Sequence, residues 1–478
     1  MNVLVTPLMY SSKRFTGISN VNFFAEAVAH VNKFRDDVYW DFAVPCTKEY
    51  IDWDDSDFAH LERVRLLPIL SPAASDATVY KDGFAGTDQP FFSPLCFKHF
   101  SEKDFPKYDV VLSRYCTANF VVRWQSEYSA KYHYMLPKIG LPAVINVIGE
   151  TTLDKDLPKL DCETGRLLLA TGMASSALTL VLTPADVSEM LSIARSMLSP
   201  SQVKKLAIYD ILPAIDKTRV PQHQRPQDRC TFFHGGTFEA KRHLKFLAES
   251  VEKLFTLGKK ANLQLCTQWE KAPQWFLEQG DWLLTKTAVS RSQFYEEMKN
   301  GDFVLCYIDY EGTGLATTEC IVSGMTPIIM QRPWNKGRYS PTYPFYCKNE
   351  NDFVAAMNFC ASNPKKAKEI GQTEIARVRR DCDSLIIGER WSAFLDKAVA
   401  FRNNETRTRA KGHFMLDLVG KAVSTLPDQF TKEELIKAVA LQSRSLDKSK
   451  VVAMWWVVRA CAMASGTKEI SPTDWRKE

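Results

Sequence analysis

The sequence lacks the residue patterns that mark several large classes of enzyme. Its 12 cysteines include no CxxC pair, its eight histidines form no HExxH motif, and no P-loop occurs. No Ser–His–Asp arrangement can be recognised either. Metal chemistry and P-loop chemistry therefore have no support, and we expect no bound metal.

Membrane-spanning and export segments are also not indicated. Leu167–Ala185 is free of charge, but threonines, serines, a glycine and Pro184 dilute it, which predicts a buried helix end followed by a buried strand. The first residues have no basic cluster before their apolar run, so they predict a strand and not a signal peptide. We expect a cytoplasmic protein with buried free thiols at Cys46, Cys230, Cys266, Cys306 and Cys320.

The composition is that of a globular protein, with 45% hydrophobic and 24% charged residues. A length of 478 residues predicts two or three domains. Short apolar runs alternate with helical patterns, which is typical of parallel α/β domains. Residues 72–107 interrupt this alternation with Pro, Gly and seven aromatic rings. We favour plain packing of these rings over stacking on an acceptor.

The stretch Gly301–Met330 combines two apolar runs with a glycine turn. Phe303–Ile308 predicts a buried parallel strand, and Thr326–Met330 predicts the next one. Between them, Leu315–Ser323 has a helical pattern that Gly324 ends. The turn lies at the carboxyl end of the first strand, where open parallel sheets bind ligands.

This turn predicts a site for a nucleotide sugar. It consists of Gly312, Thr313, Gly314 and Leu315. Free N–H groups and the dipole of a helix N-terminus attract a diphosphate, and the glycines let the backbone approach it. Glu311 and Glu319 flank the turn, and carboxylates accept hydrogen bonds from sugar hydroxyls. The alternative is an ordinary βα turn with two surface glutamates.

The stretch resembles the donor-site motif of glycosyltransferase family four, whose members are retaining enzymes with the two-Rossmann GT-B fold. Members carry EGFGL, a second Glu, and then ASGxPVV. This chain has EGTGL at 311–315, then Glu319, and SGMTPII at 323–329. The resemblance implies that Glu311 contacts hydroxyls of the transferred sugar and acts in catalysis. It also implies that Glu319 binds the donor ribose and that no metal is required.

A second phosphate-binding segment is expected in the turn after the strand Cys230–His234. The family has GRLxxxKG there, and its Arg and Lys neutralise the diphosphate. Gly235 and Gly236 form the turn in this chain, with Lys241 at the Lys position. Because Gly236 stands at the Arg position, we expect Arg242 to compensate. A solvated helix start is the alternative.

Two further positions are assigned to the acceptor side. Gly17 lies in a tight turn before a helical pattern over residues 23–34, where the family has its acceptor-side loop. The family often has a histidine after a middle strand of the N-terminal domain, and the comparable places here carry none. Glu150, at the end of a later strand, is the candidate acceptor-side base.

The patterns divide the chain into four segments. Residues 1–212 form an N-terminal Rossmann-like acceptor domain, and residues 213–229 form a linker rich in Pro, Gln and charge. Residues 230–401 form a Rossmann-like nucleotide-sugar donor domain, and residues 402–478 form an appendage. In GT-B enzymes the last helix of the donor domain crosses back onto the N-terminal domain, and Glu389–Phe401 is that helix here.

The appendage carries the positive excess of the chain. It has 14 Lys or Arg against nine Asp or Glu, an excess equal to the whole formal charge of +5. Helical patterns over 414–423, 434–441 and 450–464 and a short β wing resemble a winged-helix nucleic-acid module. Its candidate DNA-contacting residues are Lys448, Lys450, Arg459, Lys468, Arg476 and Lys477. The competing interpretation is a dimerisation or partner-binding cap with Trp455 and Trp456 as core.

The patterns predict a nucleotide-sugar transferase, and the family resemblance implies a retaining hexosyltransferase with a UDP-sugar donor. The favoured acceptor is a hydroxymethylated pyrimidine in DNA, as for phage enzymes acting in a host cytoplasm. The rival enzyme is a cytoplasmic transferase that builds an envelope polysaccharide, a lipid-linked glycan or a glycoprotein. The rival from another class is an inactive GT-B-like protein that binds nucleic acid, which the presence of Glu311 and Glu319 disfavours.

Overall fold

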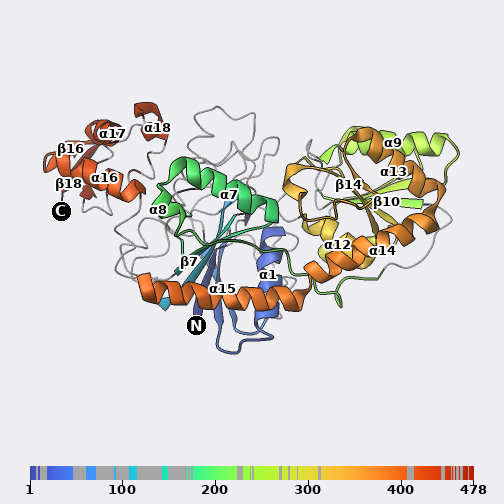
Figure 1. Cartoon of the computed structure of the whole chain (residues 1–478), viewed down its shortest axis with the longest axis horizontal. Helices are drawn as coiled ribbons and strands as arrows, with labels where there is room; N and C mark the ends of the chain where they lie inside the picture. The colour runs from blue at the N-terminus through green and yellow to red at the C-terminus, as the bar shows by residue number, and fades with distance from the viewer. Residues whose placement is uncertain are drawn as a thin grey trace.

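The chain forms two parallel α/β domains and a small C-terminal module (Figure 1). The structure is a computed structural model. It describes residues 1–6, 9–10, 19–46, 61–70, 91–92, 107–115, 143–148, 170, 173, 176–222, 230–236, 238, 242–267, 272–277, 280–287, 289–309, 314–405, 414–442, 447–453, 455, 458, 462, 467–471 and 473–477.

The N-terminal domain contains a seven-stranded sheet of order β4-β3-β1-β6-β7-β8-β9, with every neighbouring pair parallel. Its strands are β1 (Asn2–Thr6), β3 (Tyr39–Cys46), β4 (Val64–Leu70), β6 (Val110–Tyr115), β7 (Ala143–Ile148), β8 (Leu178–Val181) and β9 (Ile208–Asp210). A separate antiparallel pair joins β2 (Met9–Tyr10) to β5 (Phe91–Phe92). The helices are α1 (Ser19–Val31), α7 (Pro184–Met197) and α8 (Pro200–Val203).

The donor domain has a six-stranded parallel sheet of order β12-β11-β10-β13-β14-β15. Its strands are β10 (Cys230–Gly235), β11 (Ala261–Cys266), β12 (Leu283–Lys286), β13 (Phe303–Cys306), β14 (Thr326–Met330) and β15 (Tyr346–Cys347). Its helices are α9 (Leu244–Thr256), α10 (Gln274–Leu277), α11 (Arg291–Met298), α12 (Leu315–Ser323), η5 (Pro333–Asn335), α13 (Glu350–Ser362) and α14 (Pro364–Asp381). Figure 1 shows α9 and α13 on one face and α12 and α14 on the other.

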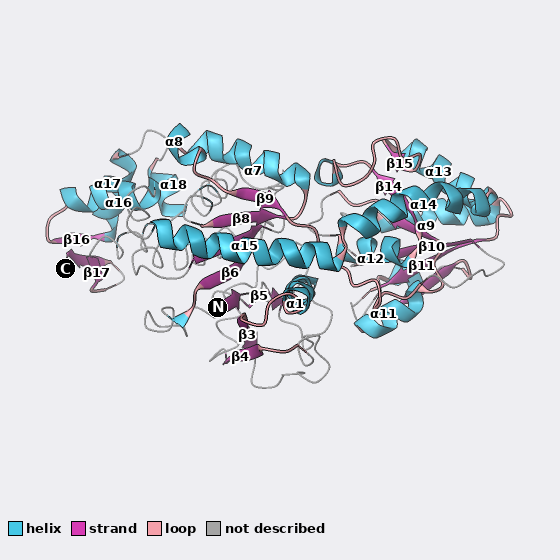
Figure 2. Cartoon of the chain, turned by 60° about the horizontal axis from the view of Figure 1, so that its bottom comes forward, coloured by secondary structure: helices cyan, strands magenta, loops and turns pink. Residues whose placement is uncertain are grey.

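Helix α15 (Ser384–Glu405) leaves the donor domain and packs on the N-terminal domain beside α1 (Figure 2). Trp391 is 1% exposed and makes edge-on ring contacts with Phe23 of α1, at 6.0 Å between centroids. Such burial of a large ring contributes about 3 kcal/mol to stability. The crossing helix that the family resemblance implies is therefore present, and it starts five residues earlier than the pattern predicted.

The expected linker is packed over the part that the structure describes, residues 213–222. Ile215 and Val220 belong to the donor-domain core, whereas Ala214 belongs to the N-terminal core. Ile215 also forms an isolated parallel bridge with Asp383, directly before α15. Two chain segments therefore join the domains side by side.

Within the described residues, the C-terminal module contains three helices and a three-stranded antiparallel sheet of order β16-β18-β17. In chain order its elements are α16 (Phe414–Thr425), β16 (Gln429–Thr431), α17 (Lys432–Leu441), α18 (Lys448–Ala453), β17 (Thr467–Glu469) and β18 (Asp474–Lys477). Its core forms around fully buried Trp475, against which Trp455 packs edge-on at 5.9 Å. Trp455 is therefore at least partly a core residue, as the competing interpretation expects.

Seven cysteines of the described residues are buried free thiols, including Cys230, Cys266, Cys306 and Cys320, as predicted. No helix within the described part of the chain is both long enough and apolar enough to cross a membrane. The segment from Leu178 onward is the fully buried strand β8, as its pattern predicted.

Candidate active site

The carboxyl ends of β10 and β13 meet where the connections of the donor sheet change face. β10 leads to α9 on one face, and β13 leads to α12 on the other (Figure 1). Open parallel sheets bind ligands in the crevice at such a point. The two segments touch there, because a Cβ atom built on Gly235 would lie 3.3 Å from the Cβ of Ala316 in α12. The structure therefore brings the two predicted phosphate-binding segments together.

Helix α12 starts at this crevice with a left-handed glycine. Gly314 is its N-cap, with φ 53° and ψ 42°, a conformation that glycine adopts without steric cost. Leu315 is 7% exposed and belongs to the core, so its contribution to a ligand site is its backbone N–H. Outside the described residues lie Glu311, Gly312 and Thr313.

Glu319 lies on the second turn of α12 and is 4% exposed. Its Oε1 atom accepts one hydrogen bond from Arg291 Nη2 at 2.8 Å and one from the Tyr295 hydroxyl at 2.9 Å. Burial and the Glu319 charge raise the pKa of Tyr295, so the hydroxyl keeps its proton and donates. The carboxylate is thus held in one orientation by two residues of α11.

Arg291 also reaches the N-terminal domain. Its Nη2 atom lies 3.3 Å from Glu26 Oε1 in α1, and the same oxygen accepts from Arg219 Nη1 at 2.9 Å. Burial acts to raise the pKa of Glu26, but His30, 3.5 Å away, and the two arginines outweigh it, so that this pKa is lowered. Arg291 therefore joins two buried carboxylates that belong to different domains.

The glycine turn after β10 is covered by an arginine. A Cβ atom on Gly236 would lie 2.8 Å from Arg242 Nη1, so the guanidinium packs directly against this glycine. Gly236 stands where the family has its arginine, and Arg242 fills the space that the absent side chain leaves. His234, one residue before the turn, is neutral, because burial and the Arg242 charge lower its pKa to about 3.

A second polar cluster lies at the same edge of the sheet. His243, at the start of α9, has φ 47°, and its Nε2 lies 2.8 Å from Asp309 Oδ2. Its ring stacks on Tyr307 at 4.1 Å between centroids. Arg332 donates to Asp309 Oδ1 at 3.1 Å and covers the Tyr307 ring. A non-glycine residue in the left-handed region costs about 1–3 kcal/mol, and such strain is typical of functional sites.

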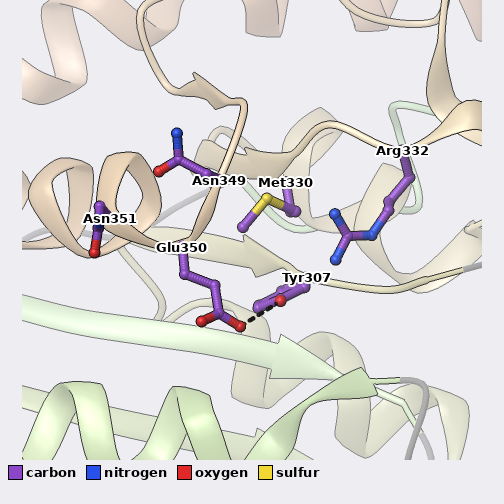
Figure 3. A pocket seen from close by; sticks show the side chains of 6 residues that line it. All are labelled: Tyr307, Met330, Arg332, Asn349, Glu350 and Asn351. Atoms are coloured by element: carbon purple, nitrogen blue, oxygen red, sulfur yellow. Dashed lines mark hydrogen bonds between the residues drawn. The ribbon is translucent and has the colours of Figure 1, made fainter.

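An open pocket of about 390 Å³ adjoins this cluster (Figure 3). It is lined by Tyr307, Met330, Arg332, Asn349, Glu350 and Asn351. The Tyr307 hydroxyl donates to Glu350 at 2.7 Å, the bond drawn dashed in Figure 3. Amides, a carboxylate, a guanidinium and a ring face together suit a ligand that is rich in hydroxyl groups.

The candidate DNA-contacting residues lie in the C-terminal module, at the opposite end of the molecule from the donor domain (Figure 1). Lys468 and Arg476 are exposed and stand directly opposite each other on β17 and β18. Within the described part of the chain, neither forms an ion pair. Like charges opposite each other destabilise a strand pair, so stability does not explain them. Lys448, at the start of α18, pairs with Glu433.

Several predicted residues cannot be placed. The structure does not describe Gly17, Glu150, Lys241 and Arg459. It describes Lys450 only through its backbone in α18. Their roles stay predictions. Among the described residues, no group of three His, Cys, Asp or Glu side chains could hold a metal ion.

Sequence patterns missed the residues that hold Glu319. Helix α11 was not predicted, and with it Arg291 and Tyr295 were overlooked. A signal was present, because Ser290 and Gln293 form a capping box, with reciprocal hydrogen bonds at 3.2 and 2.8 Å. Glu26 carried no comparable signal, since one acidic residue in an apolar helix has no distinctive pattern.

No family model matches the sequence, and no curated protein matches it. Solved structures do match. The crystal structure of TarM aligns over 83% of this chain and 98% of its own, with TM-score 0.58 and 10% identity. Sucrose-phosphate synthase from Thermosynechococcus elongatus aligns over 84% and 99%, with TM-score 0.60 and 12% identity. The pneumococcal O-GlcNAc transferase GtfA, solved with UDP and GlcNAc, aligns over 84% and 99%, with TM-score 0.56 and 11% identity.

These neighbours are GT-B glycosyltransferases. At such low sequence identity, a match over nearly the whole of each neighbour establishes the fold. The predicted two-domain GT-B architecture of the chain is therefore confirmed.

Proposed function

We propose that the protein is a retaining glycosyltransferase that moves a hexose from a UDP-sugar to an acceptor hydroxyl. The observation that carries this proposal is the meeting of the Gly235 turn, covered by Arg242, with the N-terminus of α12 at the switch point of the sheet. Helix N-termini and arginines bind diphosphates. In support, UDP is bound in the solved structures of Anabaena HepE and pneumococcal GtfA.

Each residue has a separate role in this proposal. Arg242 and Lys241 neutralise the charge that the leaving diphosphate gains when its bond to the sugar carbon breaks. The dipole of α12 adds to this stabilisation. Glu319 accepts hydrogen bonds from the ribose, and Glu311 accepts them from the transferred sugar. Glu150 is the candidate base that takes the proton of the acceptor hydroxyl.

The acceptor in this proposal is a hydroxymethylated pyrimidine in DNA. The C-terminal module supports it with the element order of a winged helix: one helix, a strand, two helices and two strands, with the first strand pairing with the last. The exposed Lys468 and Arg476 present adjacent positive charges of the kind that contact phosphates. A hydroxymethyl group is reached in the major groove or by flipping the nucleotide.

The second candidate acceptor is an envelope polysaccharide, a lipid-linked glycan or a glycoprotein. The pocket beside Tyr307 favours it, because Asn349, Asn351 and Glu350 offer partners for hydroxyls. Glu350 also carries a charge that repels phosphate. This pocket lies in the donor domain, where Tyr307 follows β13 and Met330 ends β14.

Incubation with a panel of UDP-sugars tests both acceptors. Hydroxymethylated DNA, the same DNA without hydroxymethyl groups, and a polysaccharide acceptor are compared by mass spectrometry. The proposal predicts a mass gain of one sugar on the modified base alone. Transfer only to the polysaccharide would establish the second candidate. A protein that binds DNA but neither binds UDP nor uses any donor would be an inactive GT-B-like nucleic-acid-binding protein.

A further inference from the structure

The charged side chains around Arg291 lie at the boundary between the two large domains. The side chains of Glu26 and Glu319 are each 5% exposed, and that of Arg291 is 12% exposed. One guanidinium nitrogen, Nη2, serves both carboxylates. A buried carboxylate needs a partner, so the position of each acid depends on the arginine that they share.

The other contacts of the two acids are separate. Arg219, from the chain segment that joins the domains, contacts Glu26, whereas Tyr295, from α11, contacts Glu319. Among the interactions described for these side chains, Arg291 is the link between the N-terminal helix α1 and the donor-domain helix α12. A change at Glu26 is therefore passed to Glu319 through the guanidinium.

We propose that Glu26 is a positioning residue for the donor site, which acts through Arg291 on the carboxylate of Glu319. This inference rests on the proposed function, in which Glu319 binds the donor ribose. Glu26, in the N-terminal domain, contacts the same guanidinium nitrogen that donates to Glu319. It thereby fixes the direction from which Arg291 approaches Glu319. The N-terminal domain thereby contributes to nucleotide affinity without touching the nucleotide.

The position of α1 extends this coupling to the acceptor side. The helix begins at Ser19, two residues after Gly17, where the acceptor-side loop is expected. Phe23, Phe24 and His30 of this helix lie against the crossing helix α15. A donor nucleotide that steadies Glu319 would therefore also steady the helix that follows the acceptor loop.

A double-mutant cycle on UDP affinity tests the inference, with calorimetry of the full-length protein. The variants are Glu26→Gln, Glu319→Gln and the pair. Glu26→Gln keeps the shape of the side chain, and a thermal melt checks its folding. We expect it to weaken UDP binding about threefold to tenfold, which lies within the range measured for residues that share a partner. In the Glu319→Gln background, the same change should have no further effect.

Two further variants test whether Arg291 carries the effect of Glu26 to Glu319. Arg291→Lys keeps the charge but loses the planar guanidinium, which contacts the Tyr295 hydroxyl through Nε and both acids through Nη2, and it should abolish the effect of Glu26→Gln. Arg219→Gln is the matched control, because Arg219 contacts the same oxygen of Glu26 but not Glu319. Because Arg219→Gln leaves the Glu26–Arg291–Glu319 contacts in place, it should weaken UDP binding less than Glu26→Gln does. In turnover, Glu26→Gln should raise the KM for the UDP-sugar and leave kcat unchanged.

The outcomes separate this inference from the proposed function. UDP binding that weakens in Glu319→Gln but not in folded Glu26→Gln would overturn the inference and leave the proposed function standing. Equal effects of Glu26→Gln in the parent and Glu319→Gln backgrounds would also overturn it, since the two acids would then act independently. Absence of UDP binding by the parent protein would overturn both.

Discussion

Charged side chains around Arg291 of the donor domain are buried and paired, whereas Lys468 and Arg476 of the C-terminal module are exposed and lie beside each other. In the donor domain, Arg291 is enclosed between two carboxylates and a tyrosine, and each partner has a defined distance. In the C-terminal module, Arg476 is exposed beside another cation, Lys468. A buried network specifies one geometry and so indicates which atoms a ligand would meet. An exposed pair creates a field that favours a class of partner, here a polyanion.

The largest expected difference between the two regions is the loss of unfolding free energy when one arginine is removed from each. Arg291→Met leaves two buried acids without the partner that they share, and we expect a loss of about 3 kcal/mol in unfolding free energy. Arg476→Met is the matched change at an exposed site and should cost less than about 0.5 kcal/mol. Urea denaturation followed by tryptophan fluorescence measures both. Equal losses would show that the two regions do not differ in this way.

Loss of the Glu319 carboxylate should weaken the binding of UDP. A charge-assisted hydrogen bond to the ribose is worth about 1.5–3 kcal/mol, and Glu319→Ala should lose it. The control is Glu296→Ala on the neighbouring helix α11, since Glu296 is exposed and pairs with Lys299. Calorimetry with UDP compares the two variants with the parent. Parent-like affinity in folded Glu319→Ala would remove Glu319 from the donor site.

In the C-terminal module, charge reversal should affect DNA binding and leave donor binding unchanged. Lys468→Glu with Arg476→Glu should flatten the slope of log affinity against log salt by about 2, one unit for each lost phosphate contact. Lys421→Glu with Lys437→Glu is the matched control, because these exposed lysines lie on helices α16 and α17 and not on strands β17 and β18. If both pairs change the slope equally, strands β17 and β18 are not the contact surface.

The smallest effect is a pH dependence. The pKa of Glu26 lies below its ordinary value of 4.5 in the folded protein. Its contribution to stability is therefore complete above the unfolded pKa and is lost as the pH falls through the folded value. Melting curves between pH 6 and pH 3 should show a smaller decline for Glu26→Gln than for the parent. Asp428→Asn, at an exposed site in the C-terminal module, should leave the decline nearly unchanged.

Local sequence patterns predicted the donor sheet well, because its strands are continuous apolar runs and its turns carry glycine. Helix α12 and strand β14 have the predicted bounds, Leu315–Ser323 and Thr326–Met330, whereas β13 starts at the predicted Phe303 and ends two residues before the predicted Ile308. The short strands β9 and β15 were not predicted, since three and two residues are too few to show a period. The packing of Ile215 and Val220 also escaped prediction, because proline and charge around them are typical of linkers.

The candidate site was only partly predictable for a different reason. Glu319 could be named from sequence because it occupies a motif position, and Arg242 because it directly follows one, the Lys position at 241. The contacts of Arg291 with Glu319 and with Glu26 span 28 and 265 residues of chain, and no local pattern encodes such a contact. The His243–Asp309 contact spans 66 residues in the same way.

The most direct test of the central claim measures UDP release from UDP-sugars by the parent protein and by Glu319→Gln. The account predicts that at least one UDP-sugar is cleaved in the presence of an acceptor, and that Glu319→Gln needs a higher donor concentration to reach half its maximal rate. Release at the same rate and the same donor dependence in both proteins would contradict the assigned site. Absence of UDP binding and of release with every donor would contradict the proposed activity.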